Sequence, residues 1–151
     1  MNPASLPESP DEFRRQLNGL LFSLLSWQQL TDFWSKIDRT AGWYLYAIGE
    51  PLPLSPASAA QVEKFVVEID ALLRDSHRES YCGIVYANDV EHPRFVKIYD
   101  PDHLGSSCGS ASNPTLPGWV MSLTPPSELK PRYVVPANRR RWWQSLFPEG
   151  Q

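Results

Sequence analysis

The order of the apolar patterns is the feature that most constrains the fold of this sequence. In the first half of the chain, apolar residues recur every three or four positions, which is the spacing of an amphipathic helix. After residue 80 the apolar residues fall in short β-branched and aromatic runs, separated by glycine, proline and asparagine. This order indicates an α+β domain. We therefore predict a mainly antiparallel sheet of about four strands packed against three to four helices.

Two helices are predicted before residue 42 from caps followed by apolar stripes. The first helix is capped by Ser9, and its stripe continues to Leu25. Ser26 and Gln29 form a capping box, in which each side chain bonds the backbone N–H of the other residue. This box predicts a second helix, or a bent continuation of the first, that ends before Gly42.

Two further helices are predicted later in the chain. Ser55 is the expected cap of a helix that has Pro56 at its first position and ends near Arg74. A last helix is expected at Arg139–Phe147, with Asn138 as its cap.

The expected strands share β-branched or aromatic composition and flanking turn residues. They are Trp43–Ile48, Tyr81–Ala87, Arg94–Tyr99 and Trp119–Leu123, with Arg132–Val135 at best a short edge strand. The second and third of these look like an antiparallel hairpin. The strand–helix–strand piece Trp43–Ala87 could form one parallel pair through a right-handed crossover.

Length and composition predict one domain. The chain has 151 residues, of which 42% are hydrophobic, so a core can form without a metal or a disulfide. We expect residues 1–8 to be a flexible N-terminal tail and residues 9–148 to form a single α+β domain.

Charge and cysteine usage narrow the class of protein. The net charge of −3 argues against a nucleic-acid binder, which would need a strong positive field. The apolar run Leu20–Trp27 is too short to span a membrane, and no cleavage site follows it. We therefore expect no membrane partner and a cytoplasmic location, where Cys82 and Cys108 stay reduced.

The loop Asp100–Gly118 is the best candidate for a functional surface. It has no periodic apolar pattern, and loops of this length in compact domains are usually functional or disordered. Asp100-Pro101-Asp102 could form an Asx-type turn, in which the Asp100 side chain bonds the backbone. A structural or partner-contact role for most of the loop is our main interpretation.

Cys108 gives this loop an alternative, chemical interpretation. His103 lies five residues before it and could lower the pKa of its thiol. The run Ser106–Ser110 is similar to the nucleophile loop of chymotrypsin-like cysteine proteases, but those enzymes are double β-barrels and this chain is shorter and helical. Residues 105–109 also match G-x-S-x-G, but no helix pattern follows, as that motif requires.

The same loop contains residues that could hold a metal ion or an anion. His103 and Cys108 could both act as ligands, with Cys82, His92 or Asp102 completing the set, but the paired C-x₂-C spacings typical of zinc sites are absent. The glycines and serines could bind an anion through backbone N–H groups, although the loop has no lysine or arginine. We predict no metal and no cofactor.

The run Arg139-Arg140-Arg141-Trp142-Trp143 is the second candidate surface. Arginines in the first turn of a helix oppose its dipole by roughly 0.3–1 kcal/mol each at an exposed site. Internal carboxylates could compensate, with Trp142 or Trp143 packed in the core. An acidic partner, or stacking on single-stranded bases, could explain the run instead.

These patterns contain no complete catalytic constellation. We predict a small non-enzymatic accessory protein that binds a protein partner through the Gly/Ser-rich loop and the Arg/Trp C-terminus. The alternative is a thiol-dependent enzyme, or a redox- or metal-responsive protein, using Cys108 with His103. A homodimer is also compatible, because the first helices carry apolar residues on more than one face. The expected binding residues are Asp102, His103, Ser106, Ser107, Cys108, Arg139, Arg140, Arg141 and Trp142.

Overall fold

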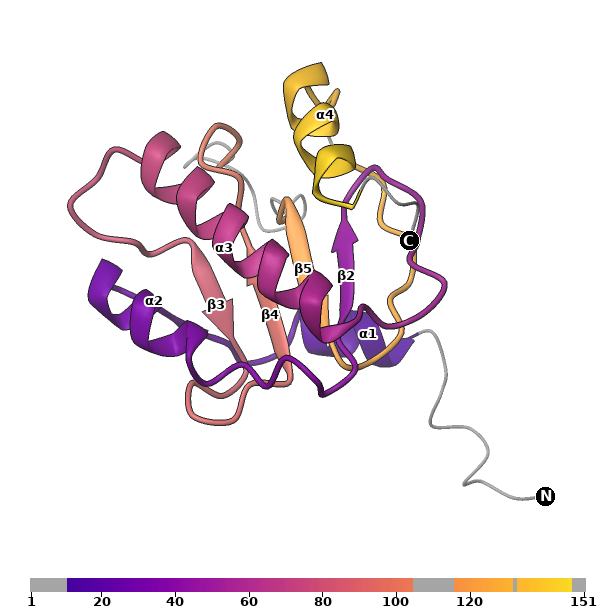
Figure 1. Ribbon diagram of the computed structural model, residues 1–151, viewed down its shortest axis with the longest axis horizontal. Coiled ribbons are helices and arrows are strands. Elements are labelled where there is room, and N and C mark those ends of the chain that lie inside the picture. The colour runs from indigo at the N-terminus through magenta and orange to yellow at the C-terminus, as the bar shows by residue number, and fades with distance from the viewer. Residues whose placement is uncertain (1–10, 105–115, 132, 148–151) are drawn as a thin grey trace.

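A computed structural model describes residues 11–104, 116–131 and 133–147 of the chain (Figure 1). Within these residues the chain is an α+β fold. Its elements, in order, are α1 (Asp11–Leu17), β1 (Phe22–Ser23), α2 (Trp27–Trp34), β2 (Tyr44–Ala47), α3 (Ala59–Ser76), β3 (Val85–Ala87), β4 (Phe95–Ile98), β5 (Trp119–Ser122) and α4 (Ala137–Leu146).

The strands form one sheet in the order β1-β3-β4-β5-β2. Every hydrogen-bonded pair of strands is antiparallel, as predicted. The expected parallel pair between the strands that flank α3 is wrong, because β4 and β5 lie between β2 and β3. The hairpin of β3 and β4 is confirmed, with Tyr86 opposite Lys97.

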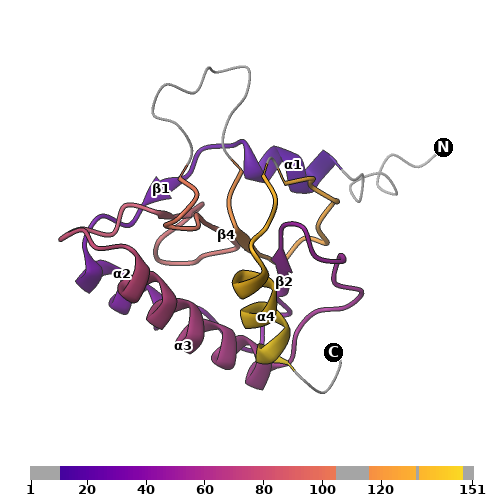
Figure 2. The ribbon, with the colours of Figure 1, turned by 90° about the horizontal axis from the view of Figure 1, so that it is seen from above.

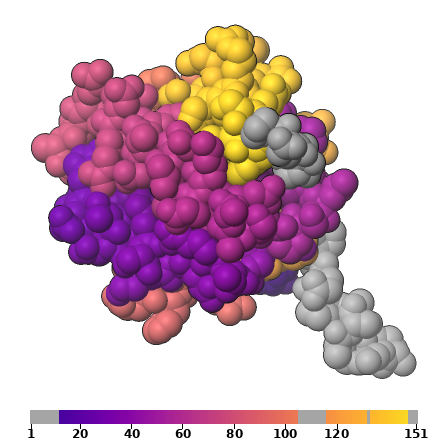
Figure 3. Space-filling view, in the orientation of Figure 1, coloured from indigo at the N-terminus to yellow at the C-terminus, as the bar shows by residue number. Residues whose placement is uncertain are grey.

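The helices cover the two faces of the sheet unequally (Figure 2). Helices α2 and α3 lie over one face, together with α4, and Figure 3 shows these three helices covering the side turned to the viewer. Helix α1 lies on the opposite face. Successive strand residues point to opposite faces of the sheet, so each strand contributes to the core on both faces. Val96 and Ile98 of β4 face the larger cluster, while Phe95 faces α1.

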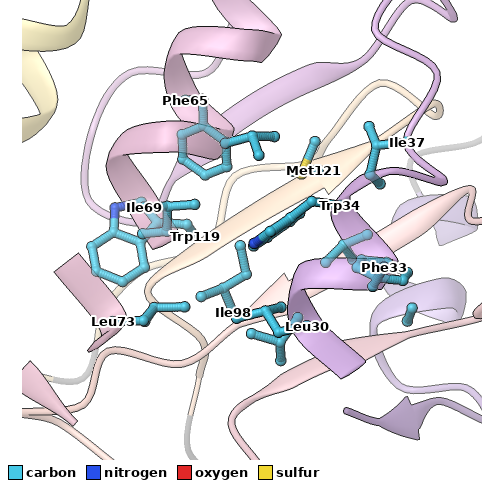
Figure 4. Packing of buried hydrophobic residues seen from close by; sticks show 14 of the residues in the cluster. Leu30, Phe33, Trp34, Ile37, Phe65, Ile69, Leu73, Ile98, Trp119 and Met121 are labelled. Carbon is cyan, nitrogen blue, oxygen red and sulfur yellow. The ribbon is translucent and has the colours of Figure 1, made fainter. Parts of the chain in front are cut away.

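The larger core lies between the sheet and the helices α2 and α3 (Figure 4). Leu30, Phe33 and Trp34 of α2 meet Phe65 and Ile69 of α3 above the sheet. The stripe predicted for α3 is therefore its buried face.

The first helix is shorter than predicted. Helix α1 ends at Leu17, and the run after Gly19 becomes the edge strand β1 rather than more helix. Leu24 N–H donates to the carbonyl of Val85 at 2.9 Å, so the sheet supplies the hydrogen bonds that a helix would have given this segment. The expected cap Ser9 lies outside the described residues.

Two of the three remaining caps differ from the prediction. The Ser26–Gln29 capping box of α2 is confirmed. Helix α3 is capped by Ser58 in a box with Gln61, so the expected cap Ser55 is wrong.

Helix α4 begins at Ala137, two residues earlier than the predicted start at Arg139. Its N-cap is Pro136, whose ring has no group that can hydrogen-bond to the backbone. Asn138 therefore lies inside the helix, and the expected cap Asn138 is wrong. Residues 133–135, part of the expected edge strand, are not a strand.

No helix in the described ranges combines the length and the apolar character that a membrane span requires.

Candidate functional site

The loop predicted as a functional surface begins in a buried turn. Asp100 follows β4, and its side chain is only 4% exposed. Its Oδ1 accepts a hydrogen bond from the backbone N–H of Asp102 at 2.9 Å, and its carbonyl accepts from the N–H of His103 at 2.9 Å. The expected Asx-type turn is therefore confirmed. It directs the chain away from the sheet at the point where the loop starts.

Arg139 of α4 binds this turn from the other end of the chain. Its Nε donates to Asp100 Oδ2 at 2.8 Å and its Nη2 donates to Asp100 Oδ1 at 3.1 Å. The same Nη2 lies 3.0 Å from Asp102 Oδ2. Hydrogen bonding to Asp100 raises the pKa of the Arg139 guanidinium. The bidentate ion pair of Arg139 with Asp100 therefore joins the arginine run of α4 to the start of the loop, two surfaces that the sequence suggested separately.

The same ion pair accounts for an arginine at the start of α4. Arg139 is the third residue of a helix whose first turn has neither a capping side chain nor an acidic residue. A positive charge there opposes the helix dipole. The carboxylates of Asp100 and Asp102 supply the compensating negative charge from outside the helix.

The other two arginines face outward to different degrees. The Nε of Arg140 lies 3.5 Å from Oε2 of Glu50, whose side chain is nearly buried. Arg141 is exposed and has no ion-pair partner within the described part of the chain. Of the three arginines in the run, Arg140 and Arg141 therefore offer guanidinium groups to another molecule.

The two tryptophans attach α4 to the core. The Trp142 ring lies edge-on to Trp119 of β5, with ring centroids 5.4 Å apart. The Trp143 ring lies edge-on to Phe65 of α3 at 6.0 Å. Both tryptophans are partly buried against the main cluster. The prediction that Trp142 or Trp143 packs in the core is confirmed for both residues.

His103 lies against Tyr133 beside this ion pair. The two rings are stacked, with centroids 3.9 Å apart and an angle of 5° between their planes. The Nδ1 atom of His103 is buried, lies 3.8 Å from Asp100 Oδ2 and has no hydrogen-bond partner among the described residues. Burial raises the pKa of the Tyr133 hydroxyl, and the nearby Asp100 charge raises it further while Arg139 lowers it.

A small cavity of about 20 Å³ lies at this junction. Its polar and aromatic lining includes Glu50, Asp100, Tyr133, Arg139, Arg140 and Trp143. A volume of this size holds about one water molecule, because a single water needs roughly 10–15 Å³ of free space. It does not accommodate a metabolite or a nucleotide.

The predicted chemical residues are only partly brought together. Asp102, His103 and Arg139 meet around Asp100, while Ser106, Ser107 and Cys108 lie outside the described residues. No group of three His, Cys, Asp or Glu side chains in the described ranges could hold a metal ion. Cys82 is buried in the core, and burial raises the pKa of its thiol.

Three residues of the junction were absent from the predicted site. Glu50 and Tyr133 carried no signal, because each comes from a proline-flanked connector distant in sequence. Asp100 was recognised as a turn residue but not as the partner of Arg139. The one available signal was the unbalanced arginine run at a helix start, which indicates that a carboxylate lies elsewhere in the fold.

Comparison with protein-family models, with curated proteins and with solved structures finds no match to this chain.

Proposed function

We propose that this protein is a non-enzymatic interaction protein that binds a protein partner through the exposed side of α4 and the adjoining loop 100–118. The supporting observation is the contact of Arg139 with Asp100 and Asp102, which fixes the start of α4 against the start of the loop. Fixing the start of a loop favours binding, because less conformational entropy is lost when the partner binds.

The charges exposed on α4 favour a partner with an acidic surface. Arg141 is exposed, and Arg140 is more than half exposed even though it lies near Glu50. Arginine is enriched in protein interfaces, and complementary charge mainly increases the rate of association.

The test of this proposal uses Arg141→Glu, with Arg94→Glu as the matched control. Arg94 is also exposed, but it lies in the β3–β4 hairpin, away from α4 (Figure 1). Tagged wild-type protein and both variants are used to capture partners from a lysate of the source organism at low and at high salt. We expect a partner that wild type and Arg94→Glu retain, that Arg141→Glu loses, and that high salt releases. Equal recovery by all three proteins would contradict the proposal.

Arg139 is unsuitable for that test. Its replacement would leave the buried Asp100 carboxylate without its main partner, so loss of binding would follow from unfolding. Arg141 carries no such structural contact in the described part of the chain, and its replacement therefore reports on the surface alone.

A thiol-dependent activity of Cys108 is the second candidate. The observation that favours it is the position of His103, whose Nδ1 faces the Asp100 carboxylate at 3.8 Å. A catalytic or thiol-activating histidine is usually supported by a carboxylate, and Asp100 lies near this ring nitrogen, at a distance longer than a hydrogen bond. Under this proposal Cys108 alkylates much faster than Cys82 at neutral pH, and His103→Gln slows only Cys108. Equal, slow labelling of both thiols, followed by mass spectrometry, would exclude it.

We also propose a cytoplasmic location, which keeps both thiols reduced. Cys82 is a free, fully buried thiol. Cell fractionation with thiol titration of the freshly isolated protein tests this proposal, and a disulfide between Cys82 and Cys108 would contradict it.

A further inference from the structure

Lys97 of β4 is a partly buried cation that has no carboxylate partner in the part of the chain that the structure describes. Its side chain lies on the α1 side of the sheet, because Phe95, two residues earlier, packs in the cluster beneath that helix. The Nζ atom donates to the carbonyl of Leu17, at the end of α1, at 3.2 Å. An ammonium has three hydrogen atoms, so two donors of Lys97 remain for another molecule.

The environment of Lys97 disfavours its positive charge. Burial lowers the pKa of the Lys97 ammonium, and no neighbouring charge contributes to this shift. By contrast, Lys36 and Lys64 each have a glutamate partner, Glu91 and Glu68. A charge that is taken out of water without a partner is costly, and a nearby anion offsets that cost. Lys97 therefore favours an anion supplied from outside the described residues.

Two tyrosines lie beside the Lys97 ammonium. Its Nζ atom is 5.8 Å from the ring centroid of Tyr86 and 5.6 Å from that of Tyr99. The two rings are edge-on to each other, with centroids 5.7 Å apart. Neither hydroxyl has a hydrogen-bond partner within the described ranges, and burial raises the pKa of the Tyr99 hydroxyl, which therefore stays protonated. An ammonium and two phenols make a group that is rich in hydrogen-bond donors.

The register of the sheet places this group beside the area that α1 covers. One row of residues runs across the sheet on this face, from β1 to β2: Ser23, Tyr86, Lys97, Val120 and Tyr46. Val120 and Tyr46 belong to the apolar cluster beneath α1. Ser23, Tyr86 and Lys97 are partly exposed, so a solute can reach the ammonium.

We propose that Lys97, Tyr86 and Tyr99 form a binding site for one oxyanion, the carboxylate or phosphate group of a small ligand. The anion accepts hydrogen bonds from the Lys97 ammonium, which binds such groups as a point charge, and from the tyrosine hydroxyls. No second cation influences Lys97, so the site fits a single anionic group rather than the many phosphates of a nucleic acid.

Acylation of the lysines, followed residue by residue with mass spectrometry, tests this site. Only the neutral amine reacts with an acetyl ester, and a bound anion raises the pKa of Lys97 and slows its labelling. The control is Lys130, which is exposed and has no ion pair among the described residues. Inorganic phosphate and sodium acetate are each compared with sodium chloride at equal ionic strength.

At least one of the two anions should protect Lys97 and leave Lys130 unprotected. We expect labelling of Lys97 to slow by about tenfold and that of Lys130 to change by less than about twofold. Protection by phosphate alone assigns a phosphorylated ligand, and protection by acetate alone assigns a carboxylate. Equal protection of both lysines, or no protection by either anion, would overturn the inference.

Two variants that keep the shape of the site complete the test. Lys97→Met keeps the length of the side chain but removes the charge, so phosphate or acetate, whichever protects Lys97, should raise the Tm of wild type only. Combined Tyr86→Phe and Tyr99→Phe keeps both rings and should weaken binding of that anion by about tenfold. Stabilisation of either variant at wild-type anion concentrations would overturn the site. Helix α4 lies over the other face of the sheet, so Lys97→Met should leave the partner captured through Arg141 unchanged (Figure 2).

Discussion

At the scale of single residues, Asp100 is the centre of the candidate site. Its carboxylate accepts from the backbone of Asp102 and from two nitrogens of Arg139. A buried carboxylate without such partners would carry a large desolvation cost. The contact therefore holds both side chains in one arrangement and attaches the turn at Asp100–Asp102 to the start of α4.

Removing Arg139 should destabilise the fold far more than removing its neighbour. The Arg139 side chain is 11% exposed and Asp100 is 4% exposed, so Arg139→Ala leaves a buried charge unpaired. The expected loss in the free energy of unfolding is about 3–5 kcal/mol. Arg141→Ala on the same helix should change it by less than about 0.5 kcal/mol. Urea denaturation measures both, and similar values for the two variants would show that the ion pair contributes little.

The sequence predicted part of this site at the residue level. One of the two interpretations of the arginine run was that it pairs with carboxylates of the same protein. This interpretation is confirmed for Arg139 and Arg140. The identity of the carboxylates could not be predicted, since Asp100 and Arg139 are separated by 39 positions along the chain. Their contact depends on α4 packing across the sheet, and no local pattern encodes that.

At the scale of elements, periodicity and caps were informative to different degrees. The stripe of α3 and the hairpin of β3 and β4 were predicted, because each pattern is long or bounded by turns. Leu20–Leu25 was misassigned to a helix, because a short apolar run fits either element. Hydrogen bonds to β3 make this segment a strand, and they depend on tertiary structure that the local sequence does not show.

The start of α3 allows a matched pair of substitutions. The Ser58 hydroxyl accepts from Gln61 N–H at 3.2 Å, and Gln61 Oε1 accepts from Ser58 N–H at 2.9 Å. Ser58→Ala should therefore lower the free energy of unfolding by about 1 kcal/mol. Ser55→Ala, at the cap suggested by the sequence, should have almost no effect. Thermal unfolding of both variants checks this, and a larger effect at Ser55 would mean that the helix starts earlier.

At the scale of the whole molecule, the sheet separates two apolar clusters. The larger one includes Trp119 and Met121 beneath α2 and α3, whereas the smaller one packs Phe13 of α1 with Tyr46 of β2. Both use the same central strands β4 and β5, on opposite faces. Loss of either layer should therefore weaken the other, which is what a single domain over residues 9–148 requires.

Truncation of Phe13 tests this cooperativity. Phe13 is fully buried and packs against Phe95, with ring centroids 5.6 Å apart. Phe13→Ala should cost about 3–5 kcal/mol, whereas Phe22→Ala, at an exposed position, should cost less than about 0.5 kcal/mol. Far-UV circular dichroism follows all the helices, while tryptophan fluorescence follows mainly the opposite face, where Trp119 lies. In one cooperative unit both signals shift to the same lower urea midpoint in Phe13→Ala. If only the dichroism shifted, α1 would unfold separately, and the single-domain prediction would be wrong.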